Sequence, residues 1–119
     1  MSPTQRTLAE LRKRGWPAQV VEQTVPRTFI KRDLFGCIDI IAVVPTIEVG
    51  GFVVQHCRIL GIQVTSGSNH SARVTKALKE PRMRAWCEAG GQFEVWSWAK
   101  RGPRGKRKAW MLRTEGVQP

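Results

Sequence analysis

Residues 32–43 read RDLFGCIDIIAV, and residues 59–66 read ILGIQVTS. Both are apolar runs with the length and the β-branched content of buried strands. Each run also contains a polar residue that a plain core strand would exclude, Asp39 in the first and Gln63 in the second. A buried carboxylate is unfavourable unless it is paired or binds a metal, and oxygen ligands on two strands at one sheet edge suit a hard cation such as Mg²⁺. The two stretches therefore predict a metal site on a β-sheet.

The composition limits the partners of such a site. The chain has 119 residues, which suffice for one domain with a modest core. Its 20 Lys and Arg against 9 Asp and Glu give a net charge of +11. This excess indicates an anionic partner, with nucleic acid as the first candidate and an anionic membrane surface as the second. No apolar stretch is long enough to cross a membrane, and the N-terminus has no signal-like apolar core, so we expect a soluble, cytoplasmic protein with no membrane partner.

The cysteines predict neither a disulfide nor a zinc site. Cys37, Cys57 and Cys87 are odd in number, far apart and outside any C-x-x-C spacing. Their apolar neighbours predict reduced thiols in the core.

Helix and strand signals alternate along the rest of the chain. We expect, in order, a helix over 7–14, a strand over 18–25, the Asp39 strand, a strand-rich segment over 47–62, helices over 71–79 and 81–87, and strands over 92–98 and 109–113. Gly50-Gly51 interrupts the segment 47–62, which is either one hairpin or one long strand with a bulge. The order predicts a single domain over 1–119, an α/β sandwich in which helices flank a mixed β-sheet, with a frayed tail over 115–119.

This order of elements, with Asp39 on one strand and Gln63 on the next, resembles the PD-(D/E)xK nuclease superfamily. The superfamily includes restriction endonucleases, archaeal Holliday-junction resolvases and many small phage nucleases. Residues 36–41, GCIDII, are similar to the G-x-x-D-I-I of resolvase-like members, and residues 61–65, GIQVT, are similar to the second half-motif. The resemblance covers residues 7–113 and implies a restriction-endonuclease-like sandwich with an Mg²⁺-dependent DNA endonuclease or Holliday-junction-resolvase-like activity, which hydrolyses phosphodiesters.

The resemblance also implies a set of metal ligands. The family's first Asp binds Mg²⁺, or Mn²⁺ in its place, and corresponds to Asp39. Gln63 stands at the second ligand position, where some branches use Gln, and the Val64 carbonyl adds a main-chain ligand. In many members an acid on the first helix completes the site, which here is Glu10. A neutral Gln leaves the site less negative than usual, so we expect it to hold Mg²⁺ more loosely.

The second half-motif departs from the family at Thr65, where the family has a lysine. That lysine stabilises charge on the phosphate, and electrostatic stabilisation of this kind is often the largest contribution to catalysis. One explanation is that a lysine reaches the same point from the following helix, and Lys76 is then the best candidate. The other is that the site has lost catalysis and kept binding.

Three further residues near these motifs are secondary candidates. Asp33 stands six residues before Asp39 and either caps a turn or is a second acid near the metal. The polar turn that begins at Ser66 either holds phosphate with its backbone N–H groups or only caps the next helix. His70 either acts as a general base or is an exposed loop side chain.

A basic loop over 99–109 lies between two predicted strands that carry tryptophans. Trp96 and Trp98 share a strand face and are expected in the core, with stacking on an exposed base as the alternative. The loop and the helix before it supply the cations expected to contact DNA phosphates: Arg73, Lys100, Arg101, Arg104, Lys106, Arg107 and Lys108.

Three functions fit these features. The first is a metal-dependent endonuclease that acts on DNA, including branched or single-stranded DNA, as a homodimer if two cuts need two sites. The second is a catalytically inactive nucleic-acid-binding module on the same fold. The third is a structural subunit whose basic loop binds an acidic protein or an RNA scaffold.

Overall fold

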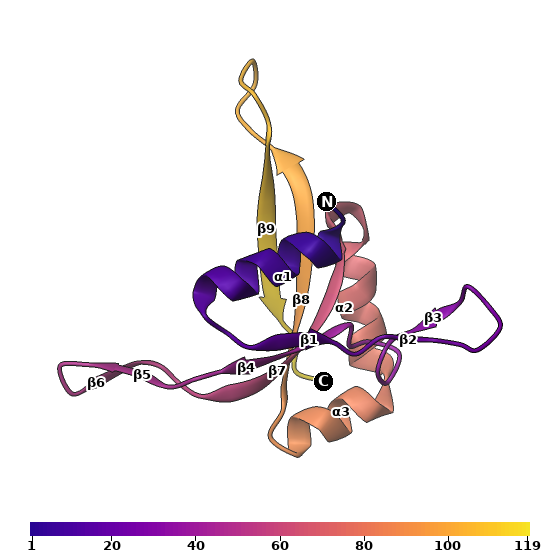
Figure 1. Ribbon diagram of the computed structural model, residues 1–119, viewed down its shortest axis with the longest axis horizontal. Coiled ribbons are helices and arrows are strands. Elements are labelled where there is room, and N and C mark those ends of the chain that lie inside the picture. Colours follow the sequence, from indigo (N-terminus) through magenta and orange to yellow (C-terminus); the bar gives the residue numbers. More distant parts are fainter.

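A five-stranded mixed sheet in the order β1-β4-β7-β8-β9 forms the centre of the computed structural model, which describes all residues 1–119 (Figure 1). The strands β7 and β8 are parallel, and the other neighbours are antiparallel. The elements are α1 (Pro3–Arg14), β1 (Ala18–Val20), β2 (Gln23–Thr24), β3 (Lys31–Arg32), β4 (Ile40–Val44), β5 (Ile47–Val49), β6 (Phe52–Gln55), β7 (Arg58–Ser66), a short 3₁₀ turn (Gly67–Asn69), α2 (His70–Lys79), α3 (Pro81–Glu88), β8 (Gln92–Arg101) and β9 (Ala109–Gly116). The expected mixed sheet flanked by helices is confirmed.

Helix α1 covers one face of the sheet. It begins at Pro3, four residues earlier than predicted, because Ser2 and Gln5 form a reciprocal capping box. Gly15 ends it in the left-handed conformation, with φ at 76°. The buried core on this face consists of Leu11, Trp16, Ile40, Ala42, Val44, Leu60, Ile62 and Trp96.

Helices α2 and α3 form the crossover between the parallel strands β7 and β8 and cover the opposite face. The core there consists of Cys37, Ile38, Ala77, Met83, Phe93, Val95 and Val117. Gly61 of β7 is tightly enclosed in this layer, since a Cβ atom at this position would lie 2.8 Å from Ile38 Cδ1. Larger residues at position 61 would therefore force apart the strand and the segment that carries Asp39.

Three hairpins project from the sheet in different directions (Figure 1). The strand-rich segment 47–62 forms one of them, the pair β5–β6, with a register shift between Ile47 and Glu48. The pair β2–β3 forms a second hairpin that the sequence analysis did not predict. The third is the end of β8–β9, in which β8 continues to Arg101 and the basic loop is reduced to residues 102–108.

Three expectations about the fold are wrong. The strand expected over 18–25 is divided between β1 and β2, which belong to different sheets. The tail does not fray at Glu115, because β9 continues to Gly116, and the buried Val117 donates its N–H to the Phe93 carbonyl at 2.9 Å. The cysteines are all free, as expected, but Cys57 is exposed beside the β5–β6 hairpin and lies outside the core. No helix in the molecule has the length and apolar character needed to cross a bilayer.

Candidate metal centre

Asp39 lies at the point where β4 separates from β7. Its N–H still donates to the Ile62 carbonyl at 2.9 Å, but beyond Ile62 the strand β7 has no β4 partner. The Val64 N–H instead donates to Asp39 Oδ2 at 2.7 Å. The side chain of Asp39 thus replaces the missing strand, which explains why a carboxylate is tolerated where only 7% of the residue is exposed.

Gln63 joins Asp39 to a second acid. Its Nε2 donates to Asp39 Oδ2 at 3.0 Å and to Asp33 Oδ2 at 3.3 Å. Its Oε1 is buried and has no hydrogen-bond partner, although the residue is only 2% exposed. A buried acceptor without a donor is unfavourable, and a cation beside it would satisfy it.

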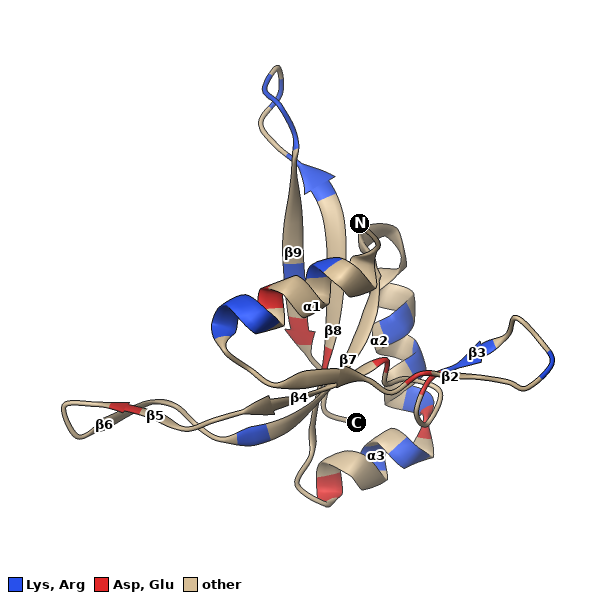
Figure 2. Cartoon of the chain, viewed as in Figure 1, with Lys and Arg blue, Asp and Glu red and all other residues tan.

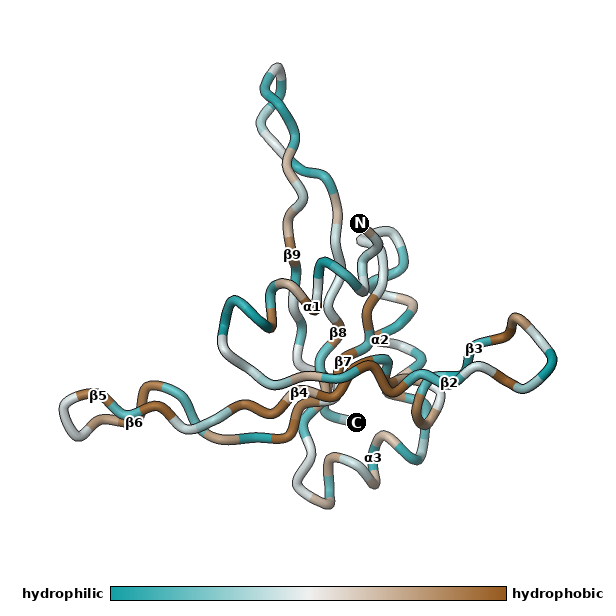
Figure 3. Tube along the Cα trace, viewed as in Figure 1, coloured by the Kyte–Doolittle hydropathy of each residue, from teal (hydrophilic) through white to brown (hydrophobic).

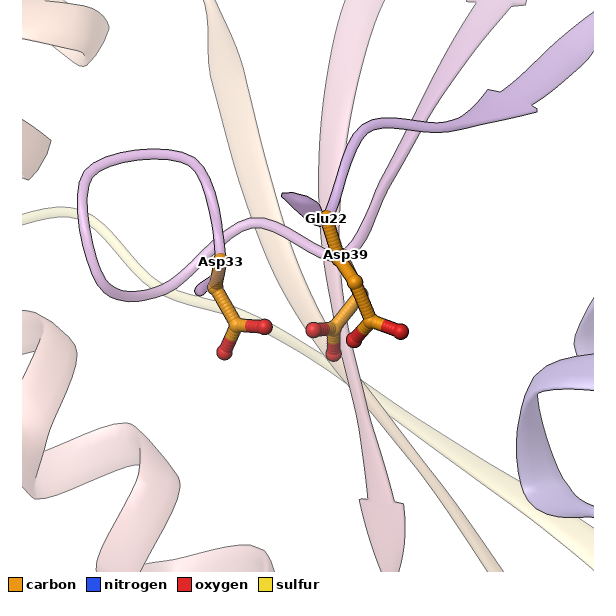
Figure 4. Close-up of side chains that lie close together, drawn as sticks. All are labelled: Glu22, Asp33 and Asp39. Carbon is orange, nitrogen blue, oxygen red and sulfur yellow. The ribbon is translucent and has the colours of Figure 1, made fainter. Parts of the chain in front are cut away.

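Three carboxylates gather at this point. Oxygen atoms of Glu22, Asp33 and Asp39 all lie within 4.8 Å of one another (Figure 4). Glu22 comes from the segment after β1, whereas Asp33 and Asp39 lie at the two ends of one turn. Glu22 follows β1, which pairs with β4, so it reaches Asp39 across the strand pair. It also pairs with Lys31 at 3.3 Å.

A tight turn returns Asp33 to Asp39. Leu34 and Ile38 pair as a bridge, and the two residues at the tip of the turn, Phe35 and Gly36, both have positive φ, 55° and 72°. A turn with two left-handed residues favours glycine, which explains the glycine of the GCIDII motif. Asp33 therefore acts as a second acid beside Asp39, which was one of the two roles considered for it.

The surroundings of Asp39 disfavour its ionised form. Burial, followed by the neighbouring Asp33 carboxyl, raises the pKa of Asp39 to about 8, although the Val64 N–H and Gln63 act in the opposite direction. A cation among the three carboxylates would reverse this balance. The oxygen-only donor set of the three carboxylates fits a hard divalent ion such as Mg²⁺ or Mn²⁺. Gln63 presents its Nε2 to these acids, so it would join them as a ligand only after its amide turned to present Oε1.

Of the two other expected ligands, Val64 lies at the acidic cluster and Glu10 does not. Val64 is at the centre, and its carbonyl points to the same side as its N–H, toward Asp39, because both groups of a strand residue face one neighbour. Glu10 is not part of the cluster: it lies on α1 and pairs with Arg14 at 3.1 Å. The acid that the structure brings to this centre is Glu22, which the sequence analysis missed.

A hollow of about 410 Å³ adjoins the acidic cluster and contains no hydrophobic residue in its lining. Its walls are Lys31, Arg32, Asp33, Gly36, Lys76 and Arg82. Arg82 is held by two hydrogen bonds to the Glu80 carboxylate, at 2.8 and 3.2 Å. Lys76, which comes from α2 and is exposed, makes no ion pair within 4.0 Å. The hollow therefore combines one of the clustered acids with four cations.

The remaining candidates, Thr65, Ser66 and His70, lie at the end of β7 or at the start of α2. Thr65 is buried on β7 two residues after Gln63. Ser66 is half-buried and its hydroxyl lies 3.1 Å from that of Ser68. His70 is buried and not a loop side chain: its Nδ1 lies 2.6 Å from Ser97 Oγ and its Nε2 lies 3.0 Å from Glu115 Oε1. Both ring nitrogens of His70 are therefore occupied away from the acids.

Six of the seven cations expected to contact DNA lie together at the far end of β8–β9 (Figure 2). Lys100 and Arg101 end β8, and the other four cations lie in the exposed loop 102–108.

Trp110 at the base of this arm lies under the guanidinium of Arg6, which is 4.1 Å from the ring centroid. Trp96 is in the core as expected, whereas Trp98 is half-buried and donates its Nε1–H to Thr7. Arg73 is half-buried on α2.

Comparisons of this chain with family models, with curated proteins and with solved structures gave no match.

Proposed function

We propose that this protein is an Mg²⁺-dependent DNA endonuclease with a restriction-endonuclease-like fold of the PD-(D/E)xK type. One observation carries the proposal: Asp39 and Gln63, from neighbouring strands, are in contact at 3.0 Å, and two further carboxylates lie at the same point. A buried acid that lies beside two half-buried ones is unfavourable unless a cation or a hydrogen-bond donor compensates for it, so the cluster supports a cation site. The net charge of +11 makes a phosphodiester the expected substrate.

The ligands in this proposal are Glu22, Asp33, Asp39 and the Val64 carbonyl, together with Gln63 Oε1 once the Gln63 amide turns to replace its Nε2. A bound divalent cation polarises a phosphoryl oxygen and lowers the pKa of an attacking water. The Val64 N–H keeps Asp39 oriented, and the tight turn at Gly36 keeps Asp33 beside it. Orientation by such contacts supports a metal site because it fixes the ligands before the ion binds.

Lys76 supplies the charge that Thr65 lacks. The lysine lines the same hollow as Asp33, so its ammonium is available to a phosphate that occupies the hollow next to the acids. Lys31 and Arg32 add positive charge to the same walls. In this position Lys76 stabilises the charge that develops on the phosphoryl oxygens.

The basic arm of β8–β9 holds the DNA. Six cations on an exposed hairpin contact backbone phosphates without reading sequence. The arm lies away from the acids, so binding and chemistry are assigned to different residues.

The test is a cleavage panel. Supercoiled plasmid, linear duplex, single-stranded and four-way-junction DNA are incubated with the protein and Mg²⁺, Mn²⁺ or EDTA. Nicked or cut products are expected with either ion, and none are expected with EDTA. Absence of cleavage in every substrate with both ions would contradict it.

A second candidate is a nucleic-acid-binding module on the same fold without catalysis. The observation that favours it is the uncharged, buried Thr65 at the position where the family has a lysine. This module would bind DNA and cut nothing, and Thr65→Lys would then create cleavage. An enzyme that already uses Lys76 would cut before this substitution.

A further inference from the structure

The β5–β6 hairpin, residues 47–55, is an apolar arm with no partner inside the molecule. Its strands pair only with each other, and it extends beyond the sheet (Figure 1). Phe52 at its tip is 76% exposed, Val54 is 63% exposed and Val49 is 62% exposed. A two-stranded hairpin with exposed apolar faces is only marginally stable in water, so this arm is expected to be covered by another surface.

An apolar hollow lies at the base of the arm. It has a volume of about 430 Å³, and it is lined by Pro17, Ala18, Gln19, Val21, Ile41 and Val43. Val43 and its cross-strand partner Ile59 are each 45% exposed, because α2 and α3 do not extend over this end of the sheet. The arm and the hollow are neighbours on the chain, but the tip of an arm cannot fold back onto its own base.

Charge indicates that the occupant is a second copy of this chain. Residues 33–57 contain no Lys or Arg, although the whole chain has 20, and Glu48 is the only charged residue of the arm (Figure 2). The residues that line the hollow are also uncharged. Two copies that each carry +11 repel one another everywhere else, so they can meet on these neutral apolar surfaces. Binding to DNA or to an anionic membrane would require cations on the arm, and residues 47–55 contain no Lys or Arg. Figure 3 shows that apolar segments alternate with polar ones along the arm.

We propose that two copies form a dimer by exchanging these arms, with Phe52 of each copy seated in the Val43 hollow of the other. The strand rise of about 3.3 Å per residue puts Val49 about 20 Å from Val43. Two arms that lie side by side in opposite directions therefore bring each tip to the base of its partner. The contact is self-complementary, as a two-fold dimer interface requires. This inference is independent of the proposed nuclease activity.

The oligomeric state of the purified full chain tests the proposal. Sedimentation equilibrium is expected to give twice 13.4 kDa at micromolar concentrations. Phe52→Asp and Val43→Lys are each expected to raise the dimer dissociation constant at least about tenfold, since both introduce a charge at a central contact. Phe29→Asp is the matched control, because Phe29 is equally aromatic and fully exposed in the β2–β3 hairpin; it is expected to leave the dimer unchanged.

Mixing the two variants tests the contact itself. A homodimer of either variant, Phe52→Asp or Val43→Lys, contains two disrupted contacts and is therefore expected to be weak. A mixed dimer has one native Phe52–Val43 contact and one Asp–Lys contact, so the mixture is expected to recover dimers. A monomer at all concentrations, a dimer unaffected by both variants, or a mixture that stays monomeric would overturn the proposal. A monomer whose DNA affinity falls with Phe52→Asp would assign the arm to nucleic acid and also overturn it.

Discussion

Asp39 accepts the backbone N–H of Val64 at 2.7 Å, and through this bond a side chain from one strand completes the edge of the next. The bond explains two features together. It gives the buried side chain of Asp39 a hydrogen-bond partner, and it orients this side chain toward Gln63 and the acids beside it. The candidate centre therefore lies where β4 and β7 separate, and the side chain of Asp39 binds the backbone of β7 at that point.

The first prediction concerns the raised pKa of Asp39. Burial raises it to about 8 in the folded protein, whereas an unfolded Asp titrates near about 4. Between these values the folded state holds a proton that the unfolded state has lost, so the free energy of unfolding is expected to fall as pH rises from about 4 to about 8. The measurement is urea unfolding in EDTA across this range.

Asp39→Asn separates this contribution from all others. The amide cannot ionise, so the variant is expected to lose the part of the pH slope that comes from position 39. A saturating divalent cation favours the ionised carboxylate and is expected to flatten the slope of the parent protein as well. Identical slopes for the parent and Asp39→Asn in EDTA would show that Asp39 is ionised in the folded state at neutral pH.

The second prediction distinguishes two acids. Glu22 lies in the cluster, whereas Glu10 pairs with Arg14 on α1. Glu22→Gln is expected to weaken Mn²⁺ binding about tenfold, which corresponds to about 1.4 kcal/mol, and Glu10→Gln is expected to leave it unchanged. Isothermal titration calorimetry measures both. If Glu10→Gln weakened Mn²⁺ binding and Glu22→Gln did not, Glu10 would be the metal ligand and Glu22 would not.

The third prediction concerns Lys76. If its ammonium contacts the phosphate, Lys76→Ala is expected to lower the cleavage rate by a factor on the order of 10²–10³. Lys79→Ala is the matched control, because Lys79 is on the same helix and does not line the hollow. In the Lys76→Ala background, Thr65→Lys is expected to restore part of the rate. Equal rates for the Lys76→Ala and Lys79→Ala variants would exclude a catalytic lysine at position 76.

The fourth prediction concerns the basic arm. Neutralising Lys100, Arg101, Arg104, Lys106, Arg107 and Lys108 is expected to weaken DNA binding similarly for all sequences. Each lost phosphate contact should lower the slope of log K against log salt by about 0.9 on duplex DNA. Fluorescence anisotropy at several salt concentrations gives this slope. A slope that does not change would place the DNA on another face of the protein.

Local patterns predicted much of the fold, because they depend on short-range rules. The alternating and 3.6-residue periods gave the strand of Asp39, the strand of Gln63 and the helix of Lys76 near their actual positions. The contact between Asp39 and Gln63 depends on the pairing of β4 with β7, which are neighbours in the sheet although the β5–β6 hairpin lies between them in the chain.

The parts that were missed depend on long-range pairing. Glu22 reaches the centre only because β1 pairs with β4 in one register, which no local signal specifies. His70 is buried because β9 continues to Glu115, so one misplaced strand end produced both the frayed tail and the exposed histidine. The apolar arm is another such case, because nothing in its sequence distinguishes a core strand from one left uncovered.

Plasmid nicking by Asp39→Ala compared with the parent protein is the most direct test of the proposed nuclease. With Mg²⁺, the parent protein is expected to convert supercoiled plasmid to nicked or linear forms. Asp39→Ala is expected to leave the plasmid supercoiled while it binds DNA as tightly as the parent, because the six cations of the β8–β9 arm, which are assigned to DNA binding, are unchanged. If a folded Asp39→Ala protein, verified by circular dichroism, nicks as fast as the parent, the centre around Asp39 is not where the chemistry occurs.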